Sequence, residues 1–217
     1  MVTQQLNILV RGPNWLGDLV MATPGFRALR SSFPDSRISL QVREGLEPVV
    51  AGSPWFDEVI PLRSHHRGLL AMWSEARELR RVQKFDLGIC LPDSFSSVLM
   101  MRMAGVSRIV GYEGRGRGAL LHDRVAVPES WGRRRMVARE QFVLGLMKAV
   151  GCQEDGTHLE LFSTEEEELR AVAALRDAGL GEARDRPIFI MAPGASFGPS
   201  KCWPAVNFSR VGDAAAL

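Results

Sequence analysis

The amino-acid sequence predicts an α/β fold built on a parallel sheet. Short apolar, β-favouring runs alternate with segments of helical periodicity along most of the chain, which is the pattern of βαβ units. Some of these runs, such as residues 6–10 and 85–91, are mostly apolar, as expected of strands covered on both faces. The composition agrees, because 46% hydrophobic and 24% charged residues are ordinary for a soluble globular protein.

The elements of the first domain follow from these patterns in order. Strands are expected at residues 6–10, 37–42, 57–61, 85–91 and 107–111. Helices are expected at residues 19–32, 46–51, 69–82, 94–103 and 136–151. Residues 112–131 are rich in glycine and arginine and are expected to form a long functional loop, and residues 152–162 a linker.

A second domain is expected after the linker, so that the chain divides into residues 1–155 and 156–217. Residues 163–166 have the spacing of a capping box, and four glutamates in the first turn suit the dipole of a helix reaching Ala178. A strand at 187–191, a loop to Ser200 and a helix from Pro204 follow. Because one strand cannot form a sheet, we expect this domain to be incomplete in the chain.

The turn after the first strand carries the main candidate for chemistry. Gly12 and Gly17 stand five residues apart, as in a phosphate-binding loop, but Asp18 occupies the position where such a loop has lysine. A carboxylate there repels a triphosphate. Asp18 is therefore either a general base for a bound hydroxyl or the side-chain cap of the following helix, and its local sequence supports both.

The second candidate is the loop at residues 193–204, between the last expected strand and the last expected helix. Gly194 and Gly198 permit close backbone approach, and Lys201 places a cation just before a helix N-terminus. These features suit a diphosphate. A glycine-rich turn with a solvated lysine explains the same residues.

Other classes of protein are disfavoured by charge and cysteine content. A net charge of +2 is too small to indicate nucleic-acid binding. Three widely spaced cysteines show no metal-type pairing and fit a reducing cytosol. The N-terminus has no basic region before its short apolar run, so a cytoplasmic protein is expected.

Three collinear motifs, at residues 12–18, 91–97 and 193–204, resemble the lipopolysaccharide heptosyltransferase family, and within it the heptosyltransferase II branch. The resemblance implies two Rossmann-like domains facing a cleft, the GT-B arrangement. It also implies inverting transfer of heptose from ADP-heptose to the lipopolysaccharide inner core, heptosyl-Kdo2-lipid A. No cofactor or metal is implied, and the enzyme would contact the cytoplasmic face of the inner membrane peripherally.

The resemblance gives the candidate residues their roles. Asp18 corresponds to the catalytic base, which favours that interpretation over the cap. Donor binding is expected of Gly17, Gly194, Ala195, Ser196 and Lys201. Acceptor binding is expected of Asn14, Trp15, Arg63, Arg67, Ser94, Arg115 and Arg117, because the acceptor is anionic and arginine suits carboxylate and phosphate.

Alternatives remain open. Each arginine of residues 113–139, a stretch with seven arginines against three carboxylates, is also explained as a solvated charge. The chain also fits a GT-B transferase that uses another nucleotide sugar, or a fragment that only binds anionic glycolipid. Since further donor-binding motifs of the family are absent, we expect this chain to be inactive alone.

Overall fold

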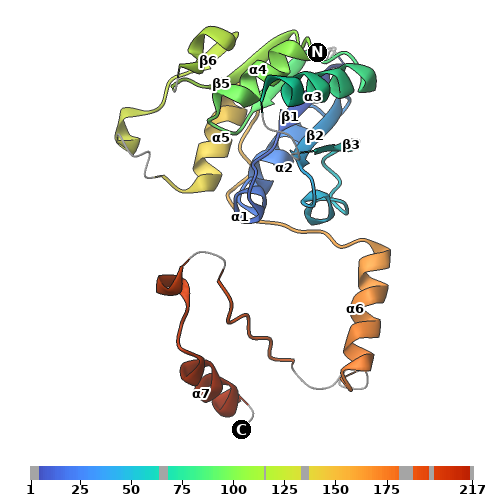
Figure 1. The fold of residues 1–217 in the computed structure, drawn as a ribbon, viewed down its shortest axis with the longest axis vertical. Coiled ribbons are helices and arrows are strands. Elements are labelled where there is room, and N and C mark those ends of the chain that lie inside the picture. Colours follow the sequence, from blue (N-terminus) through green and yellow to red (C-terminus); the bar gives the residue numbers. More distant parts are fainter. Residues whose placement is uncertain are drawn as a thin grey trace. The chain divides into compact units, whose positions relative to one another are not determined.

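The computed structural model describes residues 5–63, 68–114, 116–132, 137–180, 188–195 and 198–215. They form two compact units, Met1–Thr164 and Glu165–Leu217. Figure 1 shows a sheet flanked by helices in the first unit and two α-helices in the second. The first unit confirms the predicted α/β class.

All six strands of the sheet are parallel, in the order β3-β2-β1-β4-β5-β6. This is the order of a Rossmann fold, in which the chain reverses its direction of winding between β1 and β4. The strands are β1 (Asn7–Arg11), β2 (Arg37–Arg43), β3 (Glu58–Leu62), β4 (Leu87–Cys90), β5 (Arg108–Tyr112) and β6 (Asp123–Val125). Their carboxyl ends share one edge of the sheet, where open α/β folds bind ligands.

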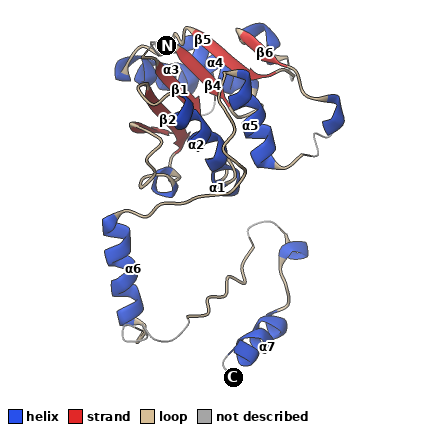
Figure 2. Ribbon diagram, turned by 180° about the vertical axis from the view of Figure 1, so that it is seen from behind, coloured by secondary structure: helices blue, strands red, loops and turns tan. Residues whose placement is uncertain are grey.

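Helices cover both faces of the sheet (Figures 1 and 2). On one face α2 (Thr23–Ser32) and α5 (Arg139–Ala149) pack against Ile8, Leu40 and Ile89. On the other, α3 (Leu69–Val82) and α4 (Phe95–Met103) pack against Leu9 and Ile109. Successive residues of a strand face opposite layers, so one strand contributes to both cores.

Two expected elements of the first unit differ from the structure. The expected helix at 19–32 is two helices, α1 (Leu16–Val20) and α2, because the chain turns at Met21 and Ala22 and restarts with Pro24 in the first turn. The expected short helix at 46–51 is a single 3₁₀ turn, η1 (Glu47–Val49).

The long loop expected at 112–131 is more ordered than its composition indicates. It contains β6 and the 3₁₀ turns η2 (Arg117–Leu120) and η3 (Glu129–Trp131). Backbone pairing with β5 overrides the weak strand propensity of residues 123–125. The expected start of the following helix, Met136, lies outside the described residues.

The expected linker packs against α2. Arg27 on α2 donates to the Glu160 carboxylate at 2.9 Å and to the Asp155 carbonyl at 2.8 Å. The ring of Phe162 meets that of Trp55 edge-on, with centroids 5.3 Å apart. The first compact unit therefore extends to Thr164, and it includes the residues between the expected boundary at 155 and this point.

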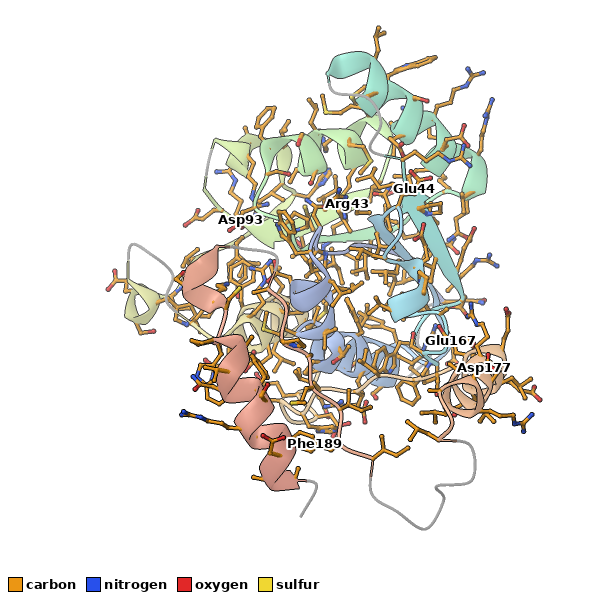
Figure 3. All side chains as sticks on the ribbon, turned by 60° about the horizontal axis from the view of Figure 1, so that its bottom comes forward. Arg43, Glu44, Asp93, Glu167, Asp177 and Phe189 are labelled. Carbon is orange, nitrogen blue, oxygen red and sulfur yellow. The ribbon has the colours of Figure 1, made fainter. Side chains whose placement is uncertain are left out.

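The second unit contains α6 (Glu165–Asp177), η5 (Pro199–Lys201) and α7 (Ala205–Ala215), close to the expected helices. The strand expected at 187–191 does not form in its described part, because residues 188–191 have no neighbouring strand to pair with. Phe189, labelled in Figure 3, is 57% exposed accordingly.

Two buried arginines organise the carboxyl edge of the sheet. Arg11, at the end of β1, donates to the carbonyl oxygens of Gly12 and Gln41 and to the side-chain oxygen of Asn14. Burial lowers the pKa of Arg11 to about 10, which still leaves it charged at neutral pH. The bonds to Gly12 and Asn14 fix the loop between β1 and α1, and the bond to Gln41 ties Arg11 to β2.

Arg117 does the same for the loop after β4. It is 1% exposed and donates to the carbonyl oxygens of Tyr112 and Pro92 and, at 2.9 Å, to the carboxylate of Asp93. Figure 3 labels Asp93 in this loop. A buried guanidinium is stable only when its donors are satisfied, so η2 and the loop after β4 are held together.

We expect Arg117→Met to destabilise the first unit by about 3 kcal/mol, because the carbonyls and Asp93 lose their buried partner. Urea unfolding followed by tryptophan fluorescence measures the change. Arg124→Met, on the exposed side of β6, is the matched control and is expected to change stability by less than about 0.5 kcal/mol. Equal destabilisation by the two substitutions would contradict the structural role of Arg117.

Candidate active site

Asp18 lies in the first turn of α1, directly after β1. The N-cap position of this helix is Trp15, which makes no side-chain cap hydrogen bond. Within the described residues no hydrogen bond joins the Asp18 carboxylate to an amide of α1, so the helix cap that the sequence left open is not formed. The side chain is 32% exposed and accessible to a ligand.

Arg139 is the cation beside Asp18. Its Nε lies 3.7 Å from Asp18 Oδ1, beyond hydrogen-bond length but within ion-pair range. The guanidinium stands over the ring of Phe142, 4.6 Å from the centroid, in a cation–π contact. The sequence indicates only that Arg139 belongs to the basic stretch at residues 113–139, since nothing local shows that α5 brings it to Asp18.

Three packed aromatic side chains, Phe142, Tyr112 and Trp131, support Arg139 in this position. The Phe142 ring packs against Tyr112, with centroids 4.4 Å apart, and against Trp131 at 5.9 Å. The Tyr112 hydroxyl donates to the Phe142 carbonyl at 3.1 Å. A Cβ on Gly145 would lie 2.2 Å from that hydroxyl, so α5 needs glycine here. The orientation of Arg139 thus depends on the packing of β5, η3 and α5.

The described acceptor candidates all follow carboxyl ends of strands. Asn14 and Trp15 follow β1, Arg63 follows β3, and Ser94 follows β4. Trp15 is 67% exposed, and Arg63 is also exposed. The structure thus brings these residues to the same edge of the sheet as Asp18. Arg67 and Arg115 lie outside the described residues.

Three of these candidates also have structural partners. The Ser94 hydroxyl caps α4 by accepting from the Ser97 amide at 3.2 Å, as its position before the helix predicts. The Asn14 side-chain oxygen accepts from Arg11. The guanidinium of Arg117 is buried among protein groups, so it supports the loop that carries Ser94 and does not face a ligand.

The two glycines of the first motif have different roles. A Cβ on Gly12 would lie 3.1 to 3.2 Å from atoms of Leu40, Gln41 and Val42, so glycine lets the loop pass close to β2. A Cβ on Gly17 would meet nothing within 4 Å. The backbone at Gly17 is therefore open to a ligand, whereas Gly12 is required by packing.

The second motif belongs to the other compact unit. Lys201 ends η5, and its amide donates to the carbonyl of Gly198, which has a positive φ of 74°. Gly194 and Ala195 are exposed, and Ser196 lies outside the described residues. α7 begins at Ala205, with Trp203 packed edge-on against Phe208. A cation thus precedes a helix N-terminus, as the sequence predicts.

Neither Cys90 nor Cys152 is a candidate nucleophile. Burial raises the pKa of Cys90 to about 11 and that of Cys152 to about 11, so both thiols are protonated at neutral pH.

Within the described ranges, no group of three or more histidine, cysteine or acidic side chains has a metal-binding arrangement. Nor does any helix in that part of the chain have the length and apolar character needed to cross a membrane.

Comparison with known proteins identifies relatives of this chain. The sequence is 28% identical over 210 residues to lipopolysaccharide heptosyltransferase 2 of Escherichia coli, and 26% identical over 212 residues to lipooligosaccharide heptosyltransferase 2 of Haemophilus ducreyi. These alignments cover 95% and 96% of this chain but 59% and 60% of the relatives. The chain therefore spans about three fifths of the length of these curated relatives.

Solved structures share the fold. The E. coli ADP-heptose lipopolysaccharide heptosyltransferase II structure superposes with a TM-score of 0.73 at 24% identity, covering 97% of this chain and 61% of its own. A family 9 glycosyltransferase from Veillonella parvula gives 0.80 at 23% identity, with coverages of 95% and 58%. The profile of glycosyltransferase family 9 (heptosyltransferase) matches residues 72–216. The chain belongs to glycosyltransferase family 9, the heptosyltransferase family.

Proposed function

We propose that the complete protein is an inverting glycosyltransferase that moves a heptose from ADP-heptose onto the inner core of lipopolysaccharide, with heptosyl-Kdo2-lipid A as acceptor. The observation that carries this proposal is the Asp18 carboxylate. It is accessible, does not cap its helix, and lies where the winding of the sheet reverses. The names of the relatives, lipopolysaccharide and lipooligosaccharide heptosyltransferase 2, support the choice of sugar and acceptor.

In the proposed reaction Asp18 is the general base. An acceptor hydroxyl oxygen attacks the anomeric carbon of the heptose from the face opposite ADP, and the bond from that carbon to the diphosphate oxygen breaks. The hydroxyl proton passes to Asp18, and ADP leaves with the electron pair. A carboxylate is suited to this step when it reaches the hydroxyl directly.

Arg139 acts on Asp18 and not on the substrate in this proposal. Held over Phe142, its guanidinium lies beside one carboxylate oxygen, Oδ1, and restrains the direction in which Asp18 points. Precise placement of a base contributes to rate, because small displacements from the reactive geometry are costly. Arg139 is therefore a positioning residue.

The second unit is proposed to begin the nucleotide-sugar domain of a GT-B enzyme. Lys201 would pair with the diphosphate of the donor, whose charge increases as ADP leaves, and the amides at the start of α7 would add to this stabilisation. Gly17, Gly194, Ala195 and Ser196 would allow the donor to approach the backbone closely. No metal is part of the proposed reaction.

The acceptor is proposed to bind along the carboxyl edge of the sheet. Arg63, Arg67 and Arg115 would meet its anionic groups, while Asn14, Trp15 and Ser94 would contact its sugars. Arg117 would contribute indirectly, by fixing Asp93 and the loop that presents Ser94. Because this acceptor is anchored in a bilayer, the protein is proposed to work at the cytoplasmic face of the inner membrane.

Asp18→Asn in the complete protein is expected to lower kcat by about 10²- to 10⁴-fold, the range for loss of a general base. Release of ADP from ADP-heptose in the presence of acceptor measures turnover. Asp177→Asn, an exposed change at the end of α6, is the control and should leave turnover intact. Retained activity in the Asp18 variant would remove the base from the mechanism.

Arg139→Gln is expected to reduce kcat about 10- to 100-fold with little change in KM for the donor, because the base is displaced while the donor site is untouched. Arg139→Lys should restore part of the rate, since it returns the charge but not the planar contact with Phe142. Arg124→Gln serves as the control. An effect confined to the KM for acceptor would instead place Arg139 on the substrate.

Lys201→Ala is expected to raise the KM for ADP-heptose about tenfold, the effect of losing one charge-assisted hydrogen bond to phosphate. The KM for acceptor should change much less. Lys148→Ala, at the exposed end of α5, controls for removal of a lysine charge. Equal weakening of donor and acceptor would indicate that Lys201 has a structural role.

A further inference from the structure

Four exposed residues of α3 form a continuous line, which we call the α3 stripe: Leu70, Trp73, Arg77 and Arg81. Steps of three and four residues place them on one face of the helix. Ala76 and Leu79 occupy the other face and are buried against the sheet. Figure 3 shows side chains of this teal helix projecting outward from the first unit.

The first half of the α3 stripe is apolar. Leu70 is 86% exposed and Trp73 is 56% exposed, one turn apart. Single exposed hydrophobic residues are common on soluble proteins, but neighbouring large ones indicate a contact surface. Tryptophan favours the boundary between water and lipid, because its ring is apolar and its N–H remains polar.

The second half is basic. The guanidinium of Arg77 lies over the Trp73 ring, 5.5 Å from its centroid. Arg81 pairs with Glu78 at 2.8 Å, an exposed ion pair one turn along the helix that is open to competition from other anions. Arg80 is exposed beside them. Three arginines against one glutamate give this face a positive charge that complements anionic lipid headgroups.

The position of the α3 stripe fits this chemistry. α3 follows β3, so its first turns, with Leu70 and Trp73, lie toward the carboxyl edge of the sheet, where Asp18 and Ser94 also lie. A lipid-anchored acceptor must bring its sugar to this edge. A bilayer contact through the start of α3 would place the membrane on the same side of the unit as the base.

We propose that the α3 stripe is the surface through which the first unit docks on an anionic bilayer. Leu70 and Trp73 enter the interface between headgroups and acyl chains, while Arg77 and Arg81 pair with lipid phosphates. An amphipathic helix bound in this way lies in the plane of the interface and does not cross the membrane. The choice of this membrane as partner rests on the proposed function, whereas the docking surface is tested without turnover.

Co-sedimentation of this 217-residue chain with vesicles tests the proposal. We expect binding to phosphatidylcholine vesicles that contain phosphatidylglycerol, and much weaker binding to vesicles of phosphatidylcholine alone. Leu70→Ser combined with Trp73→Ser should reduce the vesicle partition coefficient about tenfold or more, because both side chains lose their apolar contact. Arg77→Gln combined with Arg81→Gln should reduce it about tenfold and weaken its dependence on salt.

Leu169→Ser is the matched control for the apolar change, because Leu169 is 65% exposed on α6. This variant should bind vesicles like the unmodified chain. In addition, emission from Trp73 should shift to shorter wavelength on binding, and Trp73→Phe should remove that part of the shift. Circular dichroism should show the same helix content in all variants, since each substituted side chain is exposed.

The proposal is overturned if the α3 variants bind anionic vesicles as the unmodified chain does, or if Leu169→Ser weakens binding equally. It is also overturned if the chain sediments without vesicles through self-association that the Leu70 and Trp73 substitutions abolish, because the stripe would then bind protein. Asp18→Asn should leave vesicle binding unchanged. Loss of the catalytic proposal through an active Asp18 variant would therefore not alter the vesicle result.

Discussion

Burial of two guanidinium groups at the carboxyl edge of the sheet sets the shape of the loops that carry the candidate site. Arg11 and Arg117 are both 1% exposed, so their terminal guanidinium nitrogens need hydrogen-bond acceptors within the protein. The carbonyls of Gly12 and Pro92 meet this need. As a result, the turn after β1 is held beside β2, and the turn after β4 is held to η2 and the end of β5.

The site built on these turns depends on long-range packing. Asp18 follows β1, and Arg139 begins α5, yet the two side chains are 3.7 Å apart because α5 packs beside α2 on the same face of the sheet. Phe142, Tyr112 and Trp131 then fix the guanidinium. In the proposed mechanism this arginine, stacked on Phe142 and 3.7 Å from Asp18 Oδ1, restrains the direction in which the carboxylate points.

The arginines of the first unit have different structural roles. Arg27 attaches residues 155–160 to α2, Arg117 attaches two loops to each other, and the arginines of the α3 stripe remain in solvent. A basic stretch in sequence therefore does not correspond to one basic surface. The sequence predicts that residues 112–131 form a long functional loop. In the structure β6 pairs with β5 and Arg117 is buried, so much of this segment stabilises the sheet.

The sequence by itself determined the α/β class, the positions of the first five strands along the chain, the α3 boundaries and the capping role before α4, because periodicity and cap residues act over a few neighbours. It also singled out Asp18, in the turn between β1 and α1, and Lys201, just before α7. Only the tertiary structure decided that Asp18 does not cap its helix, that Arg139 faces it, and that Arg117 is buried. These outcomes arise from contacts between segments far apart in the chain, and no local pattern distinguishes a buried arginine from a solvated one.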